Sequence, residues 1–144
     1  MTHKSVKLTS RGQYAIMTMV ELAKATQTRP VPLSDIADRS TISLSYLEQL
    51  IAGLRRHDLV KSYRGPGGGY ILSRPSSEII IADILVAAED NTPERKSKNT
   101  SPESCKCTDT LELWHSIGAL LHSALRQVSL ADVISGNLPH ALNI

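Results

Sequence analysis

Two basic side chains and a run of glycines lie close together in the middle of the chain. The segment "VKSYRGPGGGYILSRP", residues 60–75, holds Lys61, Arg64 and Gly65 between two apolar ends. Such a run predicts either a loop that cradles a nucleotide phosphate or the tip of a β-hairpin that touches a larger partner. The segment lacks the G-x-x-x-x-G-K-S/T spacing of a phosphate-binding loop, and it leads into a β-like stretch instead of a helix. The hairpin is therefore favoured, and a nucleotide-binding enzyme is the less favoured alternative.

A second set of polar side chains lies on one face of a helix predicted within residues 41–60. The buried face of this helix is predicted from four apolar residues, Leu44, Leu47, Ile51 and Leu54. The opposite face is predicted to carry Ser45, Tyr46, Gln49, Ala52, Gly53 and Arg56, with Glu48 at its margin. Glutamine pairs with adenine, glutamate accepts a hydrogen bond from cytosine, and serine bonds to either base. This face therefore suits base reading, and the alternative is a solvated face with Ser43 or Ser45 as a helix cap.

The elements that position these residues are predicted from hydrophobic periodicity. The expected order is a helix over 8–26, a short helix over 33–40, the helix within 41–60, a hairpin from 59–64 and 69–74, and helices over 79–90, 111–128 and 129–136. The first helix is expected to place Tyr14, Met17, Val20, Leu22 and Ala25 on its apolar side. Three helices followed by a two-stranded hairpin predict a mainly α (α+β) chain with a winged helix-turn-helix DNA-binding domain.

In such a domain the helix within 41–60 enters the major groove, and the hairpin is the wing. A minor groove only about 6 Å wide admits an arginine best when its neighbour adds no bulk, so Arg64 and Gly65 are predicted to lie there. The alternative is that the glycines only form a turn and Arg64 is a solvated side chain. The predicted DNA-contacting residues are Ser43, Ser45, Tyr46, Glu48, Gln49, Arg56, Lys61, Arg64 and Gly65.

Charge and composition agree with a nucleic-acid partner and give no sign of a membrane. The first 75 residues carry eleven Lys or Arg and five Asp or Glu, whereas the remainder carries five and nine. Phosphate neutralisation supplies much of the affinity of DNA-binding proteins, so a positive half is expected of one. On charge alone, the alternative is an ordinary solvated surface. No apolar run approaches the ~20 residues that span a bilayer, and no export signal is visible at the N-terminus. A cytoplasmic protein is expected.

The last third of the chain divides into a polar segment and a helix with an apolar seam. Residues 90–110 are polar and charged and are predicted to form a loop. The helix that follows repeats apolar residues at coiled-coil spacing, namely Trp114, Ile117, Leu121, Ala124 and Val128. This seam predicts a homodimer on a pseudo-palindromic double-stranded DNA operator, and the alternative is a helix packed only on its own domain. The expected units are 1–88, which binds DNA, 89–110, the polar loop, and 111–144, the dimerisation region.

The motifs "ISLSYLEQL" and "RGPGGGY", with "LTSRGQYAIMTMVELA" near the start and "LWHSIGALLHSALRQVSLADVI" near the end, resemble the bacterial iron–sulfur cluster regulator (IscR) family. The resemblance covers nearly the whole chain. It implies a homodimeric winged-helix transcription factor, a repressor or an activator. The sequence shows no zinc-ligand spacing, nucleophile elbow or acid–base pair at a plausible position, so an enzyme is not expected. By motif position the resemblance places Ser45, Tyr46, Glu48 and Gln49 in the major groove and Arg64 and Gly65 in the minor groove.

The cysteines depart from the pattern of that family, many of whose members hold an iron–sulfur cluster with three cysteines before the long helix. This chain has two, Cys105 and Cys107, and Thr110 stands where a histidine ligand is expected. The resemblance implies that the loop over 89–110 is a sensor and ligand loop, and that a 2Fe–2S cluster has these two thiolates and His115 as candidate ligands. Further candidates are His122, Glu103, Asp109 and a donor from the partner subunit, whereas the first-helix position that is a carboxylate in some relatives is Gln13 here. The expected function is a DNA-binding regulator that senses cluster or redox status, and the alternatives are a thiol switch without metal, control by a partner protein, or no sensing chemistry.

Overall fold

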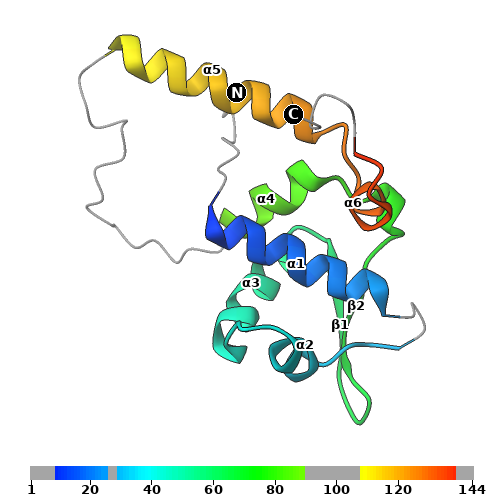
Figure 1. Cartoon of the computed structure of the whole chain (residues 1–144). Helices are drawn as coiled ribbons and strands as arrows, with labels where there is room; N and C mark the ends of the chain where they lie inside the picture. Colours follow the sequence, from blue (N-terminus) through cyan, green and yellow to red (C-terminus); the bar gives the residue numbers. More distant parts are fainter. Residues whose placement is uncertain (1–8, 26–28, 90–107, 139–144) are drawn as a thin grey trace.

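The computed structural model describes residues 9–25, 29–89 and 108–138 of the 144-residue chain (Figure 1). Along this part of the chain the elements are α1 (Ser10–Lys24), α2 (Leu33–Arg39), α3 (Leu44–Arg56), β1 (Val60–Tyr63), β2 (Gly69–Leu72), the 3-10 helix η1 (Ser76–Glu78), α4 (Ile81–Glu89), α5 (Thr108–Leu125) and α6 (Leu130–Ser135). The predicted mainly helical chain with a two-stranded wing is confirmed. The short 3-10 helix before α4 was not expected from the sequence.

Local side-chain chemistry defines the helix ends. The Thr9 hydroxyl accepts a hydrogen bond from the Gly12 amide at 3.2 Å and caps α1. Ser129 and Asp132 form a reciprocal capping box at the start of α6. Gly136 ends α6 with φ of 73°, a left-handed conformation that glycine adopts without steric cost. Because these signals act within one turn of the chain, they are readable from the sequence.

The hydrophobic core lies between α1, α3 and α4, and the described part of the chain supplies mainly Leu, Ile, Val and Ala to it. In α3 the core takes Leu47, Leu50, Ile51 and Leu54, which are spaced i, i+3, i+4 and i+7 on one helical face. Leu44, predicted to lie on this face, is instead 44% exposed at the first position of the helix. In α1 the predicted apolar residue Met17 is 49% exposed, whereas Ala15 and Met19 are buried.

The wing is an antiparallel hairpin that projects away from the helices (Figure 1). Its tip closes with a hydrogen bond from the Gly68 amide to the Gly65 carbonyl at 2.8 Å. Pro66 and Gly67 occupy the two central positions of this turn, and Gly67 has φ of 77°. Proline followed by a glycine with positive φ is the pattern of a type II turn. The glycine-rich run thus serves the backbone of the turn.

The base of the wing is tied to the chain that leads into α2. Val31 and Tyr70 exchange two backbone hydrogen bonds, each 2.9 Å long. The neighbouring Gly69 has φ of 156°, and a Cβ atom at this position would collide with the Val31 backbone. Glycine at position 69 therefore allows the close approach that fixes the wing to the helical domain.

α5 lies along the edge of the molecule opposite the wing, and the chain after it returns to the domain (Figure 1). The Ile81 amide donates to the Val128 carbonyl at 3.0 Å, and the Leu130 amide donates to the Ile79 carbonyl at 2.8 Å. α6 then packs against η1 and α1. Val128, predicted as part of the apolar seam, is instead buried in the core of its own chain, because the long helix ends at Leu125. No helix in the described part of the chain is long and apolar enough to cross a membrane.

Candidate nucleic-acid interface

The outward face of α3 carries polar side chains on a slim helix. Ser45, Glu48, Gln49 and Arg56 are all exposed, as predicted, and the small Ala52 is exposed among them. Gly53, also predicted on this face, is buried instead, because it lies between core residues on the inner side of the helix. The Arg56 Nε atom donates to the Ala52 carbonyl one turn earlier, at 3.4 Å. Hydrogen-bonding groups therefore cover the outward face of α3.

Two of the predicted contact residues also have structural roles at the start of α3. The Ser43 hydroxyl accepts a hydrogen bond from the Tyr46 amide at 3.3 Å and caps the helix. Ser43 is exposed, but its oxygen is engaged by this cap, so a DNA contact from it stays a prediction. Tyr46 is half-buried, and its ring packs edge-on against Tyr14 of α1, with ring centroids 5.8 Å apart. Tyr46 therefore links the exposed face of α3 to α1.

The orientation of α3 is set from its inner side. Leu47, Leu50 and Leu54 have no exposed surface and pack in the core that α3 shares with α4. α2 also packs against α3, and residues 40–43 connect the two helices. Because buried side chains interlock at close-packed density, α3 keeps a fixed direction in the domain.

The wing presents a basic and aromatic surface beyond α3. Lys61, Arg64 and Gly65 are exposed, as predicted. Tyr63 is also exposed and lies on the same side of β1 as Lys61, because successive residues of a strand alternate between its faces. The sequence reasoning missed Tyr63, although the two-residue alternation from Val60 onward would have identified it.

The charge of this region is positive. From α3 to the end of the wing, residues 44–74 contain five Arg or Lys and two acidic residues. Arg55 and Arg74 belong to this set and are exposed, but they were not among the predicted contacts. A cationic surface of this kind attracts the phosphates of a nucleic acid and releases their counterions. α3 and the wing thus place groups that can hydrogen-bond to base edges near cations that can pair with phosphates.

A different surface lies on α5. Trp114 and Ile117 of the predicted seam are exposed, whereas Leu121 and Ala124 are half-buried. Leu113 and Leu120 are exposed as well, and the sequence reasoning missed them. Their spacing with Ile117 and Ala124, four, three and four residues, is that of a coiled-coil seam and would have found them. The exposed apolar face of α5 consists of Leu113, Trp114, Ile117 and Leu120.

The predicted metal ligands are only partly visible. Cys105 and Cys107 lie outside the described residues, and His115 is exposed on α5. Across the described ranges, no three His, Cys, Asp or Glu side chains gather in a group that could hold a metal ion. A 2Fe–2S cluster usually takes four protein donors, whereas the chain has two cysteines in all. The described residues alone therefore do not fit such a cluster.

Sequence comparison identifies relatives over most of the chain. The family model of Rrf2, described as an iron-dependent transcriptional regulator, matches residues 8–136. The HTH-type transcriptional regulator IscR of Photorhabdus laumondii is 39% identical over 133 residues, which cover 90% of this chain and 80% of that protein.

Solved structures match the fold over a similar extent. A structure of IscR from T. potens superposes with a TM-score of 0.69 at 32% identity, covering 94% of this chain and 90% of that one. The structure of CymR, the global cysteine regulator of B. subtilis, has a TM-score of 0.68 at 34% identity, covering 90% of this chain and 96% of that one. The similarity therefore includes both the wing and the long helix α5.

Proposed function

The chain belongs to the Rrf2 family of transcriptional regulators, and on that premise we propose that it acts in the cytoplasm as a homodimer on a pseudo-palindromic DNA operator. It is a DNA-binding regulator with a winged helix-turn-helix fold, in a family of regulators and not of enzymes. The observation that carries the proposal is the exposed polar face of α3 beside a projecting basic wing.

In this proposal α3 is the recognition helix. Its exposed Ser45, Glu48 and Gln49 reach base edges in the major groove, which is about 12 Å wide and admits a helix. Tyr46 contributes the part of its ring that is not packed on Tyr14. Arg56, at the last position of α3, contacts the phosphate backbone. Small Ala52 keeps the helix slim between these two regions.

The wing follows the adjacent minor groove. Arg64 enters it, and Gly65 beside it adds no side chain and has φ of 105°, which the turn requires. Lys61 contacts phosphate from β1, on the same side as Tyr63. Because Gly69 and the Val31–Tyr70 pair hold the base of the wing, its basic tip has a defined position relative to α3.

The homodimer forms through α5. Leu113, Trp114, Ile117 and Leu120 are exposed on one helix, and a second copy of the same helix would bury them in a two-fold seam. Two copies then present two recognition helices to half-sites one helical turn apart, or a multiple of it. This gives the operator its pseudo-palindromic form.

Selection from fragmented genomic DNA tests the DNA-binding proposal. We expect the purified protein to enrich fragments with two related half-sites and to protect both in footprinting. Affinity for the enriched duplex should fall steeply as salt rises, because each neutralised phosphate releases counterions. Failure to enrich any fragment, or a single isolated half-site protected by a monomer, would overturn the proposal.

For the signal, we propose that the segment with Cys105 and Cys107 senses iron–sulfur or redox status. Support comes from the iron-dependent description of the family and from the similarity to IscR. A 2Fe–2S cluster would take both thiolates, and His115 or a group of the partner subunit would complete its ligands. The second candidate is a thiol switch without metal. It is favoured by the presence of only two cysteines and by the similarity to Staphylococcus aureus CymR, one matching structure of which is of the oxidized form.

An anaerobic absorption spectrum with iron and sulfide assays separates these two candidates. Protein purified without oxygen should show visible absorbance and bound iron, and Cys105→Ser should lose both. Protein that stays colourless after anaerobic reconstitution with iron and sulfide would exclude the cluster. A change in operator affinity on mild oxidation, absent in Cys107→Ser, would then support the thiol switch.

A further inference from the structure

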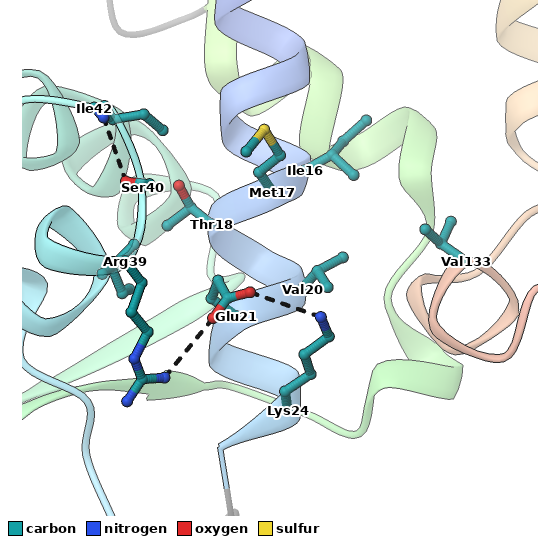
Figure 2. A pocket seen from close by; sticks show the side chains of 11 residues that line it. Ile16, Met17, Thr18, Val20, Glu21, Lys24, Arg39, Ser40, Ile42 and Val133 are labelled. Atoms are coloured by element: carbon teal, nitrogen blue, oxygen red, sulfur yellow. Dashed lines mark hydrogen bonds and ion pairs between the residues drawn. The ribbon is translucent and has the colours of Figure 1, made fainter.

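The outer face of α1 carries an open pocket that the DNA interface and the α5 face do not use. Its volume is about 390 Å³, within the range of roughly 300–1,000 Å³ found for small-molecule sites. Figure 2 shows α1 between the end of α2 and its following turn on one side and Val133 of α6 on the other. The apolar wall is formed by Ile16, Met17, Val20, Ile36, Ile42 and Val133.

The apolar wall includes a large side chain that the fold leaves uncovered. Met17 is 49% exposed, although it lies at helical spacing with the apolar residues of α1. Thr18, next to it, is buried, and its hydroxyl donates to the Tyr14 carbonyl one turn earlier. The pocket therefore offers apolar contact at its wall.

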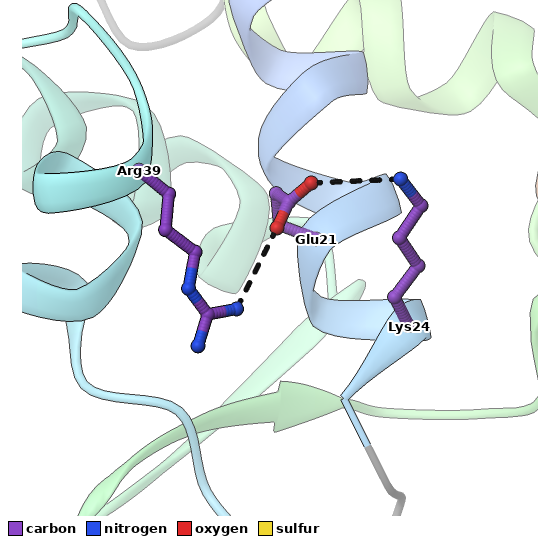
Figure 3. A network of polar contacts seen from close by, with 3 residues as sticks. All are labelled: Glu21, Lys24 and Arg39. Carbon is purple, nitrogen blue, oxygen red and sulfur yellow. Dashed lines mark ion pairs between the residues drawn. The ribbon is translucent and has the colours of Figure 1, made fainter.

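Charged groups lie at one end of the pocket. Figure 3 shows Glu21 between Lys24 and Arg39, with N···O distances of 3.7 Å to Lys24 Nζ and 3.8 Å to Arg39 Nη1. Both distances exceed the roughly 2.7–3.2 Å of a hydrogen bond, so these are loose ion pairs. The side chains of Lys24 and Arg39 are 60% and 64% exposed. Two cations face one carboxylate, which leaves an excess of positive charge beside an apolar wall.

We propose that this pocket binds a small amphipathic anion, namely an aliphatic carboxylate of medium chain length. Its hydrocarbon chain lies against Met17, Val20 and Val133, and its carboxylate pairs with Arg39 and Lys24. A planar guanidinium binds carboxylate oxygens in pairs, so Arg39 supplies orientation as well as charge. The carboxylate of Glu21 competes with the ligand for the same cations. Glu21 therefore lowers the affinity of the pocket for the carboxylate ligand.

The position of the pocket connects it to the recognition helix. Ser40 and Ile42 line it, and the Ile42 amide donates to the Ser40 hydroxyl at 3.4 Å in the turn between α2 and α3. The following residue is Ser43, the N-cap of α3. A molecule bound here therefore contacts the turn that leads into α3, although its binding does not depend on DNA.

Methionine-methyl NMR tests the proposal with decanoate as the probe, on the full chain without DNA and below the micellar concentration of the probe. The chain has three methionines, of which Met17 is in the pocket and Met19 is buried in the core. We expect decanoate to shift the Met17 methyl signal saturably while the Met19 signal stays in place. Decan-1-ol, which has the same chain without charge, should bind at least about fivefold more weakly, because it lacks the charged pairing.

Two substitutions at the rim should act in opposite directions. Arg39→Gln should weaken decanoate binding about five- to tenfold, because it removes the paired contact to the carboxylate. Glu21→Gln should strengthen it about threefold, because it removes the competing anion. Arg74→Gln replaces an exposed arginine that does not line the pocket, so it is the matched control and should leave decanoate binding unchanged.

Several results would overturn the inference. An unresponsive Met17 signal would mean that the pocket is closed in solution, for example by a second copy of the chain. Equal affinity for decanoate and decan-1-ol would exclude recognition of the carboxylate. A decrease in affinity on Glu21→Gln would mean that the carboxylate of Glu21 does not compete with the ligand. Because the measurement uses no DNA, its failure would leave the proposed operator binding unaffected.

Discussion

Helices α3 and α5 both carry an exposed face, and the two faces differ in chemistry. α3 buries its leucines and exposes Ser45, Glu48 and Gln49. α5 exposes leucines instead, and Leu120 is 72% exposed and Trp114 57% exposed. Polar groups facing outward suit hydrogen bonding to base edges, whereas apolar groups facing outward gain free energy only when another apolar surface covers them. This difference is the reason for proposing DNA as the partner of α3 and a second copy of the chain as the partner of α5.

The largest effect is expected on the inner face of α3. Leu50→Ala should lower the free energy of unfolding by about 2–5 kcal/mol, because Leu50 is fully buried and its truncation leaves a cavity. Denaturant unfolding measures the change. Gln49→Ala, one position earlier on the exposed face, is the control and should stay within about 0.5 kcal/mol of the parent. Similar losses for both variants would contradict the separation of α3 into a buried and an exposed face.

The next effect is expected on α5, where a charge would break the seam. Leu120→Asp should weaken self-association by about 2 kcal/mol or more, because the carboxylate would be buried without a partner. Light scattering against concentration measures the monomer fraction. Ala119→Asp places the same charge on an exposed neighbour about 100° around the helix and should leave the dimer intact. If Leu120→Asp stayed dimeric, the apolar face of α5 would not be the interface.

A smaller effect is expected at the wing. Arg64→Ala should weaken operator binding by about 1–3 kcal/mol and non-specific binding by less, because a minor-groove contact depends on groove shape. Lys61→Ala should weaken both equally and reduce the slope of affinity against salt by about one unit, as a phosphate contact does. Fluorescence anisotropy with the operator and an unrelated duplex measures both variants. An equal loss on both duplexes for Arg64→Ala would make Arg64 a phosphate contact.

The smallest effect on total affinity is expected at Glu48. Glu48→Ala should relax the base preference at one position of each half-site by about 1 kcal/mol, because a single hydrogen bond to cytosine is lost. Selection from a randomised operator library measures the preference, and light scattering checks that the dimer persists. An unchanged preference would remove Glu48 from the reading face and leave Gln49 and Ser45 to supply it.

The parts of the fold that depend on neighbouring residues in sequence were predictable. Ser129 caps the start of α6 and Gly136 caps its end, each through contacts within a single turn. Pro66 and Gly67 form the tip of the wing through their own backbone preferences. The exposed polar face of α3 was also predictable, because helical periodicity separates it from the leucines.

Other features depend on contacts between distant parts of the chain. Val128 continues the apolar spacing of α5, but its carbonyl pairs with the Ile81 amide and its side chain enters the core. Leu44 and Leu50 are equally apolar, and the packing of α3 on α4 decides which of them is buried. Met17 has the spacing of a core residue, yet no described segment fills the pocket beside it. Hydrophobic periodicity alone therefore does not predict which of these apolar residues the core buries.

The backbone pairing of Ile80 with Ser129 bears on the half-site spacing that the regulator accepts. This pairing connects the residues that follow α5 to the residues just before α4, and α4 packs against α3. In the proposed dimer this backbone pairing sets the distance between the two copies of α3. A change in this pairing would alter the number of base pairs between the two preferred half-sites, whereas the bases read within each half-site would stay the same.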